Sequence, residues 1–290
     1  MTTRNVVAAT ALAASRMAAG FRTRSLRHGS TIPLDPFLNV DEFHMSTPTF
    51  PPHPHAGFSA VTYMFEASDG GFINRDSLGD RSRIEPGAIH WTQAARGMLH
   101  EEIPEHPGID CHGLQMFVNL RRADKQAAPR AFHVAREHVP EWRADGARVR
   151  VLAGRCGDVE SPLVDLLTDA LLLDVQLDPG ARVSLPVRPD HNIFAMAIAG
   201  EGFADERGAT LSAEPGSDRH AVGYDHGGNT VTFTTQGRAL HLVIGGGTPI
   251  REPVVFGGPF AMTSAADVAE AFARYERGDM GQLDASFTAR

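Results

Sequence analysis

The chain has few of the residues that mark disulfide-rich, membrane-spanning or nucleic-acid-binding proteins. Its two cysteines, Cys111 and Cys156, are too few for a disulfide framework and lack metal-ligand spacing, so we expect packing residues in a reducing, cytoplasmic compartment. No apolar run reaches the length of about 20 residues that a membrane span needs. The formal net charge of −8 argues against a basic surface that would bind nucleic acid directly.

The length and composition are those of an ordinary globular protein with more than one domain. The 290 residues, 42% hydrophobic and 21% charged, predict two domains of about 120 to 150 residues each. An alanine-rich stretch at residues 6–19 faintly resembles a secretory signal, but Arg16 interrupts it, so we interpret it as mature sequence. Lys125 is the single lysine beside 26 arginines, a bias to which we assign no mechanism.

Two short clusters contain metal-ligand side chains at alternate positions. His53 and His55 form the first pair, and His100 and Glu102 form the second. Alternate residues of a β-strand share one face, so two such strands lying side by side would direct four ligands at one point. Three imidazoles and a carboxylate suit Fe, Mn, Ni or Cu, and they are more typical of a non-haem oxygenase site than of a closed zinc site. The competing interpretation of the first pair is a surface turn, because Pro54 separates its histidines.

Short strands joined by turns that contain glycine or proline dominate the rest of the sequence. With no helical run between them, they predict a β-sandwich or barrel rather than alternating strands and helices. A polar stretch at residues 121–145 indicates a domain boundary near residue 135. The predicted strands are residues 58–65, 72–77, 82–85, 88–92, 113–120, 149–154, 170–177, 181–186, 193–199, 230–235 and 239–245.

One segment predicts a helix, at residues 264–278. Ser264 is a favoured N-cap residue and Gly278 a favoured residue after the last turn. Val268, Phe272 and Tyr275 follow at helical spacing, so we expect one face of this helix to pack on a β-domain.

Several motifs along the chain resemble those of the pirin family. The resemblance is strong over residues 33–120 and 245–278 and weak over residues 136–244. The motifs are PHPHAGF at residues 52–58, DSLG at 76–79, EPG at 85–87, GMLHEEIP at 97–104, GLQMFVNL at 113–120, REPV at 251–254 and GPFAMT at 258–263.

This resemblance implies an all-β fold of two cupin domains, each a double-stranded β-helix or β-barrel, with a short C-terminal helix. The expected divisions are a metal-binding cupin domain at residues 1–135, a metal-free one at 136–258, and a tail with the helix at 259–290. The implied ligands are His53, His55, His100 and Glu102, with Fe(II) as the first choice of metal and Mn, Ni, Cu or Zn as alternatives. Among the family's activities is opening of the flavonol ring of quercetin with dioxygen; Glu102 would then accept the proton of a small enolic aromatic substrate.

Two neighbouring residues compete with the implied ligands. Glu101 should point away from the metal if its segment is extended. His90 occupies a position that resembles a ligand position of the generic second cupin motif, where many pirins have glutamine. We favour His100 as the ligand and assign His90 to the pocket or to the surroundings of the ligands.

The second half offers no ligand pair, and several apolar residues flank the first-half motifs. His191, His220, His226 and His241 lack alternate spacing, so we assign that domain no metal. The flanking residues could line a pocket, although each is equally consistent with ordinary core: they are Phe43, Phe50, Met98, Met116 and Phe117.

Two other functions fit the same ligands or the same fold. In the first, the protein is a metal-dependent redox sensor that binds a protein partner without turning over a substrate. In the second, it is a sugar- or acid-modifying cupin such as an isomerase, which suits the fold but not the pirin-like motifs.

Overall fold

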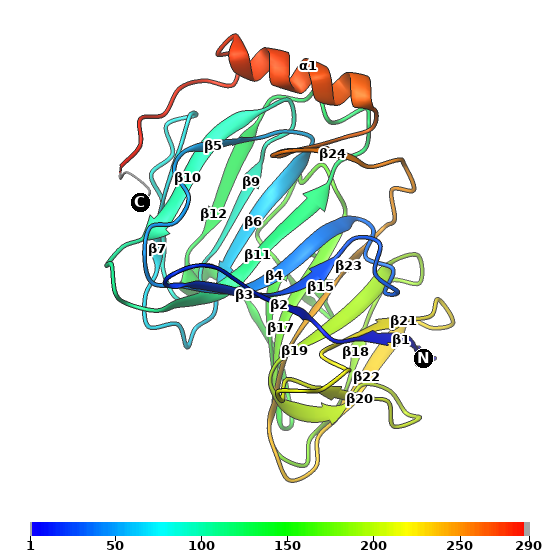
Figure 1. Ribbon diagram of the computed structural model, residues 1–290. Coiled ribbons are helices and arrows are strands. Elements are labelled where there is room, and N and C mark those ends of the chain that lie inside the picture. Colours follow the sequence, from blue (N-terminus) through cyan, green and yellow to red (C-terminus); the bar gives the residue numbers. More distant parts are fainter. Residues whose placement is uncertain (1, 287–290) are drawn as a thin grey trace. The chain divides into compact units, whose positions relative to one another are not determined.

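The computed structural model describes residues 2–286, and the regular elements of this part are strands except for one α-helix and one 3₁₀ helix (Figure 1). Two compact units divide the chain. The N-terminal unit contains Ala14–Ser25, Leu38–Arg136 and the segment that begins at Ile250, whereas the C-terminal unit contains the segment that ends at Ala13, Leu26–Phe37 and Glu137–Pro249.

The units are discontinuous in sequence, whereas the sequence analysis expects contiguous domains at residues 1–135 and 136–258 with a separate tail. Strand pairing between distant segments is the reason. Strand β1 (Val6–Thr10) pairs antiparallel with β21 (Ala221–Tyr224), which joins the start of the chain to the C-terminal unit. An isolated bridge between Ala56 and Phe260 joins the tail to the N-terminal unit.

Two large sheets and a two-stranded one build the N-terminal unit. The large sheets have seven strands in the order β12-β9-β6-β11-β4-β3-β2 and four in the order β5-β10-β7-β8. Strand β6 is buried along its whole length, as expected for a β-branched and aromatic segment covered on both faces. The strands are β2 (Ala13–Ala18), β3 (Phe21–Arg27), β4 (Phe37–Met45), β5 (His53–His55), β6 (Phe58–Met64), β7 (Phe72–Asp76), β8 (Arg83–Ile84), β9 (Ile89–Gln93), β10 (Met98–Pro104), β11 (Cys111–Asn119) and β12 (Arg130–Val134).

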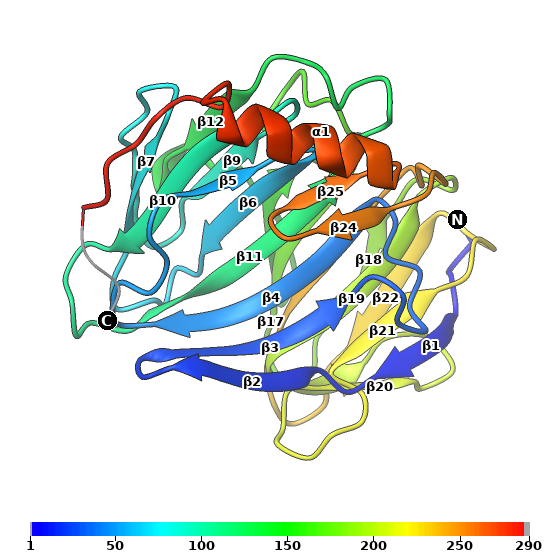
Figure 2. The ribbon, with the colours of Figure 1, turned by 45° about the horizontal axis from the view of Figure 1, so that its top comes forward.

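The predicted C-terminal helix is confirmed as α1 (Ala265–Glu276). The Asp267 backbone N–H donates to the Ser264 hydroxyl at 3.1 Å, and Gly278 follows the helix with a φ of 80°. Figure 2 shows α1 beside β24 (Val255–Gly257) and β25 (Phe260–Met262). Phe272 packs edge-on against Phe260 with ring centroids 4.9 Å apart, so part of the predicted face contacts a strand. Tyr275, however, is 40% exposed, and the buried residue of the helix is Ala271.

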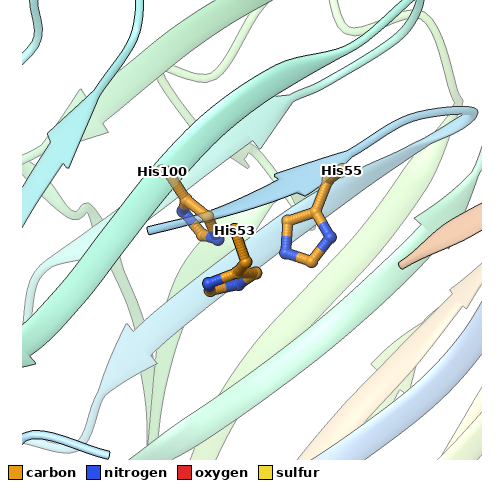
Figure 3. Close-up of side chains that lie close together, drawn as sticks. All are labelled: His53, His55 and His100. Atoms are coloured by element: carbon orange, nitrogen blue, oxygen red, sulfur yellow. The ribbon is translucent and has the colours of Figure 1, made fainter. Parts of the chain in front are cut away.

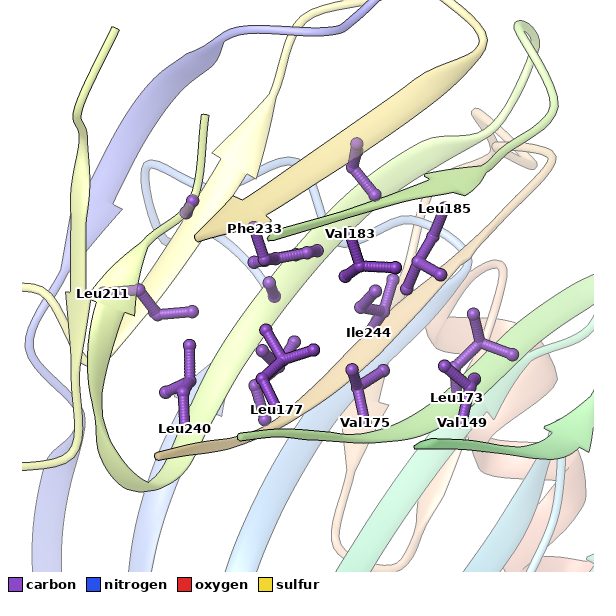
Figure 4. Close-up of a cluster of buried hydrophobic side chains, with 14 of the residues drawn as sticks. Val149, Leu173, Val175, Leu177, Val183, Leu185, Leu211, Phe233, Leu240 and Ile244 are labelled. Carbon is purple, nitrogen blue, oxygen red and sulfur yellow. The ribbon is translucent and has the colours of Figure 1, made fainter. Parts of the chain in front are cut away.

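The C-terminal unit is built on a ten-stranded sheet, together with a hairpin of β15 and β16. Figure 4 shows the inner faces of its strands meeting in a packed apolar core that includes Val175, Leu185 and Phe233. Its strands, besides β1 and β21, are β13 (Glu141–Ala144), β14 (Ala147–Ala153), β15 (Arg155–Cys156), β16 (Val159–Glu160), β17 (Ala170–Leu177), β18 (Arg182–Pro186), β19 (Asn192–Phe203), β20 (Thr210–Ser212), β22 (Thr230–Thr234) and β23 (Leu240–Gly247).

Strands also form where the sequence analysis expected none. Strands β1 to β4 precede the first predicted strand, and β12 and β13 lie in the stretch interpreted as a polar linker. Alanine and arginine have weak strand propensity, so segments such as β2 and β13 are extended because a partner strand pairs with them. Strand β4 contains phenylalanine, leucine and valine, and the sequence analysis overlooked it. The α-helix of residues 2–286, α1, is too short and too polar to cross a bilayer.

Candidate metal centre

Three histidines from two paired strands converge on one point (Figure 3). Strands β5 and β10 pair antiparallel, with His53 directly opposite His100 and His55 opposite Met98. The ring centroids of the three histidines are 4.7 to 4.8 Å apart. One nitrogen from each ring lies within 4.8 Å of the other two. The alternate spacing in the sequence therefore corresponds to a shared face of two neighbouring strands.

The proline between the first two histidines lies where a strand can accept one. Pro54 is opposite Leu99 in β5, and β5 is the edge strand of its sheet. Proline has no N–H to donate, which matters little on the outer side of an edge strand. Pro54 thus permits an extended backbone here, and the surface-turn interpretation of the pair does not describe this segment.

Burial keeps all three imidazoles neutral near pH 7. His55 and His100 are buried and His53 is partly exposed. Removal from water lowers the pKa of His53 and of His100, and it lowers the pKa of His55 to about 3. A neutral imidazole has one free lone pair, which is the form that binds a metal. The site therefore needs no loss of protons from these rings before a cation enters.

Backbone carbonyls fix the orientation of two of the three rings. The Nδ1 of His53 donates to the Pro51 carbonyl at 2.9 Å, and the Nδ1 of His55 donates to the Pro259 carbonyl at 3.4 Å. A carbonyl oxygen only accepts, so Nδ1 carries the proton and Nε2 keeps its lone pair. Such acceptors behind the ligands are typical of metal-binding histidines. The Nδ1 of His100, in contrast, is buried and has no hydrogen-bond partner.

Glu102, the fourth predicted ligand, lies on the same face of β10 as His100 but outside the group of converging donor atoms. Its Oε2 accepts a hydrogen bond of 2.6 Å from the Thr62 hydroxyl on β6. Burial raises the pKa of Glu102 to about 7, although the Thr62 hydrogen bond acts in the opposite direction. Its role as a ligand stays a prediction, and the structure adds Thr62 as a contact that no sequence pattern indicated.

Neither of the two competing residues belongs to the group of converging nitrogens. Glu101 accepts hydrogen bonds from Arg75 at 3.2 Å and from the Ser286 hydroxyl at 2.8 Å, and it is not in the group of converging donor atoms. His90 lies on β9, buried and opposite Thr62, and neither of its ring nitrogens has a hydrogen-bond partner. His100, not His90, therefore joins the group of converging imidazoles.

Aromatic rings cover one side of this group. Phe58 and Phe117 lie with their ring centroids 5.0 and 5.3 Å from that of His55. Phe50 lies 6.3 Å from His53, whereas Phe43 stacks on Phe72 in the core. Of the suggested pocket residues, Phe117 and Phe50 thus contact the histidines. Phe58, which the sequence analysis overlooked, directly follows the PHPHAG stretch.

A second group of potential ligands was missed: Glu42, His44 and His112. The alternate spacing of Glu42 and His44 in β4 was the signal that could have found it. These side chains already have partners, because Arg24 pairs with Glu42 at 2.5 Å and the Nε2 of His112 is 2.9 Å from Glu42. His44 is 2.7 Å from Asp110. We interpret this group as a polar network.

The histidines of the C-terminal unit each contact a different partner. His191 contacts Asp169 at 3.1 Å, and His241 contacts Asp174 at 2.6 Å. The Nδ1 of His220 accepts from the Leu12 N–H at 3.2 Å, and His226 is 3.1 Å from Asn192. Among residues 2–286, none of the four belongs to a group of converging ligand atoms.

The raised pKa of Glu102 predicts how metal uptake depends on pH. If Glu102 ligates the metal, its proton must leave, so affinity should fall about tenfold for each pH unit below 7 and level off above it. The three histidines contribute little to this slope, because burial has already lowered their pKa values. Competition of Ni(II) between the apoprotein and a chelator at pH 5.5 to 8.5 would measure it. An unchanged slope in Glu102→Gln would contradict the assignment.

Comparisons with known proteins agree with the fold and identify similar families. The family model described as "Pirin" matches residues 16–118, and the one described as "Pirin C-terminal cupin domain" matches residues 172–281. A pirin-like protein of Solanum lycopersicum is 36% identical over 250 residues, which cover 86% of this chain and 82% of that protein. The pirin of Homo sapiens is 34% identical over 251 residues, covering 86% and 83%.

Solved structures share the same architecture. A quercetin 2,3-dioxygenase from Acinetobacter baumannii superposes with a TM-score of 0.83 at 22% identity, covering 97% of this chain and 99% of that one. The bacterial pirin YhhW from Escherichia coli, in complex with nickel(II), has a TM-score of 0.63 at 12% identity, covering 83% and 98%. At these identities the likeness establishes the fold, an all-β arrangement with cupin domains.

Proposed function

Because this chain belongs to the pirin family, we propose that it is a metal-dependent dioxygenase, with Fe(II) held by His53, His55, His100 and Glu102, that opens the ring of a flavonol such as quercetin. The observation that carries the proposal is the convergence of three neutral, buried imidazoles. Manganese, nickel, copper and zinc suit the same donors, and the related bacterial pirin contains nickel.

The residues present fit a catalytic transition metal. Two histidines have their Nδ1 protons bound to carbonyls, so their Nε2 lone pairs are available to a cation. Three imidazoles and a carboxylate would suit an open transition-metal site that also admits a substrate. When bound, the metal would hold the electron-rich substrate and dioxygen within reacting distance and allow electrons to pass between them.

Glu102 is suited to take the proton of an enolic hydroxyl group. A bound metal would keep this carboxyl group ionised, so that it could accept a proton. Thr62 donates to Oε2, which leaves Oε1 as the atom that accepts the proton. The Thr62 hydroxyl also holds the carboxylate in place within the barrel. Phe58 and Phe117 beside His55 provide an apolar wall against which an aromatic substrate could lie while water is excluded.

The deciding experiment is oxygen uptake. Protein loaded anaerobically with Fe(II) should consume oxygen when quercetin is added and form the ring-opened product. Glu102→Gln should lower the rate about 100-fold or more, as expected for loss of a general base. Metal-loaded protein that consumes no oxygen with quercetin would refute the dioxygenase and favour the redox sensor that binds a protein partner.

The proposed reaction needs no disulfide-forming environment. Cys111 and Cys156 are both buried and unpaired. Burial raises the pKa of each thiol to about 12, so neither is a reactive thiolate at neutral pH. These properties support the proposed cytoplasmic location.

A further inference from the structure

The three converging histidines differ in what lies behind them. His53 and His55 donate from Nδ1 to carbonyl oxygens, whereas the Nδ1 of His100 is buried without a partner. Once Nε2 binds a cation, the remaining proton of a neutral imidazole resides on Nδ1. A buried N–H that donates to nothing costs about 1–3 kcal/mol. His100 therefore requires an acceptor that the other two ligands already have.

An acceptor without a partner lies on the neighbouring strand. Asp76 on β7 is directly opposite His100 on β10, so both side chains project from the same face of the sheet. Its Oδ1 accepts from the Leu78 N–H at 2.8 Å and from the Asp80 N–H at 2.9 Å, which holds the carboxylate in place. Its Oδ2 is buried and has no hydrogen-bond partner. An unpaired donor and an unpaired acceptor thus stand on directly paired residues.

We propose that Asp76 is the positioning residue of His100, and that its Oδ2 accepts the Nδ1 proton of His100 when the metal is bound. This inference rests on the proposed metal site. The hydrogen bond fixes the tautomer of His100, holds its ring toward the metal and makes Nε2 a stronger donor. It also satisfies two buried polar atoms with one contact. The three ligands would then each have an outer acceptor: two carbonyls and one carboxylate.

His90 is the competing acceptor, since both of its ring nitrogens are buried and unpaired. Its Nε2 lies 4.0 Å from Asp80 Oδ2. In this alternative His90 would accept the proton of His100 and would itself be held by Asp80. Two features favour Asp76. It is on the strand hydrogen-bonded to that of His100, whereas His90 is on β9 of the other sheet. Asp80 Oδ2 already accepts from Asn74 at 2.7 Å and from the Ser82 N–H at 3.0 Å.

The test compares Asp76→Asn with Asp80→Asn, a matched change in the same turn. In Asp76→Asn the carboxamide oxygen can still accept from the two backbone N–H groups, but the group facing His100 then donates instead of accepting. We expect Zn(II) affinity, measured by competition with a chromophoric chelator, to fall 10- to 100-fold in Asp76→Asn. Asp80→Asn should bind Zn(II) as the unchanged protein does. Equal affinity in all three proteins would overturn the proposal.

A second measurement begins with the unchanged protein and observes the proton of His100 directly. In the Zn(II)-loaded unchanged protein, nitrogen-15 NMR of the histidine rings should show a slowly exchanging His100 Nδ1–H with the shift of a proton bound to a carboxylate. Asp76→Asn should lose that signal and keep those of His53 and His55. Loss of the signal in His90→Leu, with Asp76→Asn unaffected, would assign the acceptor to His90 and refute the proposal. If the unchanged protein binds no Zn(II), the metal site itself fails.

Discussion

Replacement of His100 with alanine is expected to lower metal affinity about 1,000-fold. Removal of a hydrogen-bond acceptor behind a ligand usually lowers it only about 10- to 100-fold. His100 is opposite His53 in the β5–β10 pair, and its ring centroid lies 4.7 Å from that of His53 and 4.8 Å from that of His55. Its loss leaves two imidazoles on an edge strand with Glu102 as the remaining proposed ligand, so one of the three converging nitrogens is missing and binding weakens. Metal content after dialysis and chelator competition with Ni(II) would measure the effect.

His90→Ala is the matched control for this prediction. His90 is buried in the same unit and loses the same side-chain atoms, but it lies outside the group of converging nitrogens. We expect the metal affinity of His90→Ala to stay within about tenfold of that of the unchanged protein, because a residue that surrounds the ligands affects affinity less than a ligand does. A variant pair with the opposite behaviour, in which His90→Ala loses metal and His100→Ala keeps it, would show that the generic cupin ligand position applies here.

The site was predictable where it depends on the geometry of a single strand. Alternate residues share a face, so the spacing of His53 with His55 predicted that both side chains point the same way, and the structure brings them together. The preference for His100 over His90 came from the resemblance to the pirin motifs and not from strand geometry. Contacts made across the barrel were not predictable. Thr62 is 40 residues from Glu102 in sequence, and no pattern in either segment predicts their hydrogen bond.

The fold, too, was predictable where local sequence determines it and not where distant segments pair. Segments rich in β-branched and aromatic residues, such as β6, were predicted because their own composition favours extended backbone. Strand β2 has the sequence AASRMA, which is extended because a neighbouring strand supplies its hydrogen bonds. The pairing of β1 with β21 joins residues more than 200 positions apart, so no local sequence pattern predicts it. The discontinuous units follow from such pairings.

Replacement of Lys125 with methionine is expected to destabilise the protein by about 3 kcal/mol, near the upper end of single substitutions. The single lysine of the chain is 2% exposed, and its Nζ donates to the Gly57 carbonyl, the Asn119 Oδ1 and the Ala261 carbonyl at 2.6, 2.6 and 2.9 Å. Each acceptor that loses its donor costs about 1–3 kcal/mol, and release of the buried ammonium offsets part of the sum.

Urea unfolding at pH 7 would measure this change, with Arg122→Met as the control. Arg122 is exposed three residues before Lys125, so its replacement should change the free energy of unfolding by no more than about 0.5 kcal/mol. Equal stability of the two variants would show that the three hydrogen bonds of Lys125 contribute nothing beyond the burial of its alkyl chain.

The pH dependence of the same difference tests the charge on Lys125. Burial lowers the pKa of Lys125 from 10.5 to about 8, so between these values the unfolded chain binds more protons than the folded protein. The contribution of Lys125 to stability therefore rises with pH across this window. The difference in free energy of unfolding between the unchanged protein and Lys125→Met should be larger at pH 9 than at pH 7. Urea unfolding of both proteins at pH 7 and at pH 9 would measure this difference. A smaller difference at pH 9 would mean that the hydrogen bonds keep Lys125 protonated in the folded protein.

Lys125 also connects stability to the metal centre. Through Ala261 it holds the segment that contains Pro259, whose carbonyl accepts from the Nδ1 of His55. Loosening of this segment should free the His55 ring, so Lys125→Met should weaken Ni(II) binding about tenfold even at temperatures where the protein stays folded. Chelator competition well below the unfolding temperature would measure it. Unchanged affinity alongside the lost stability would show that His55 keeps its orientation without the Pro259 carbonyl.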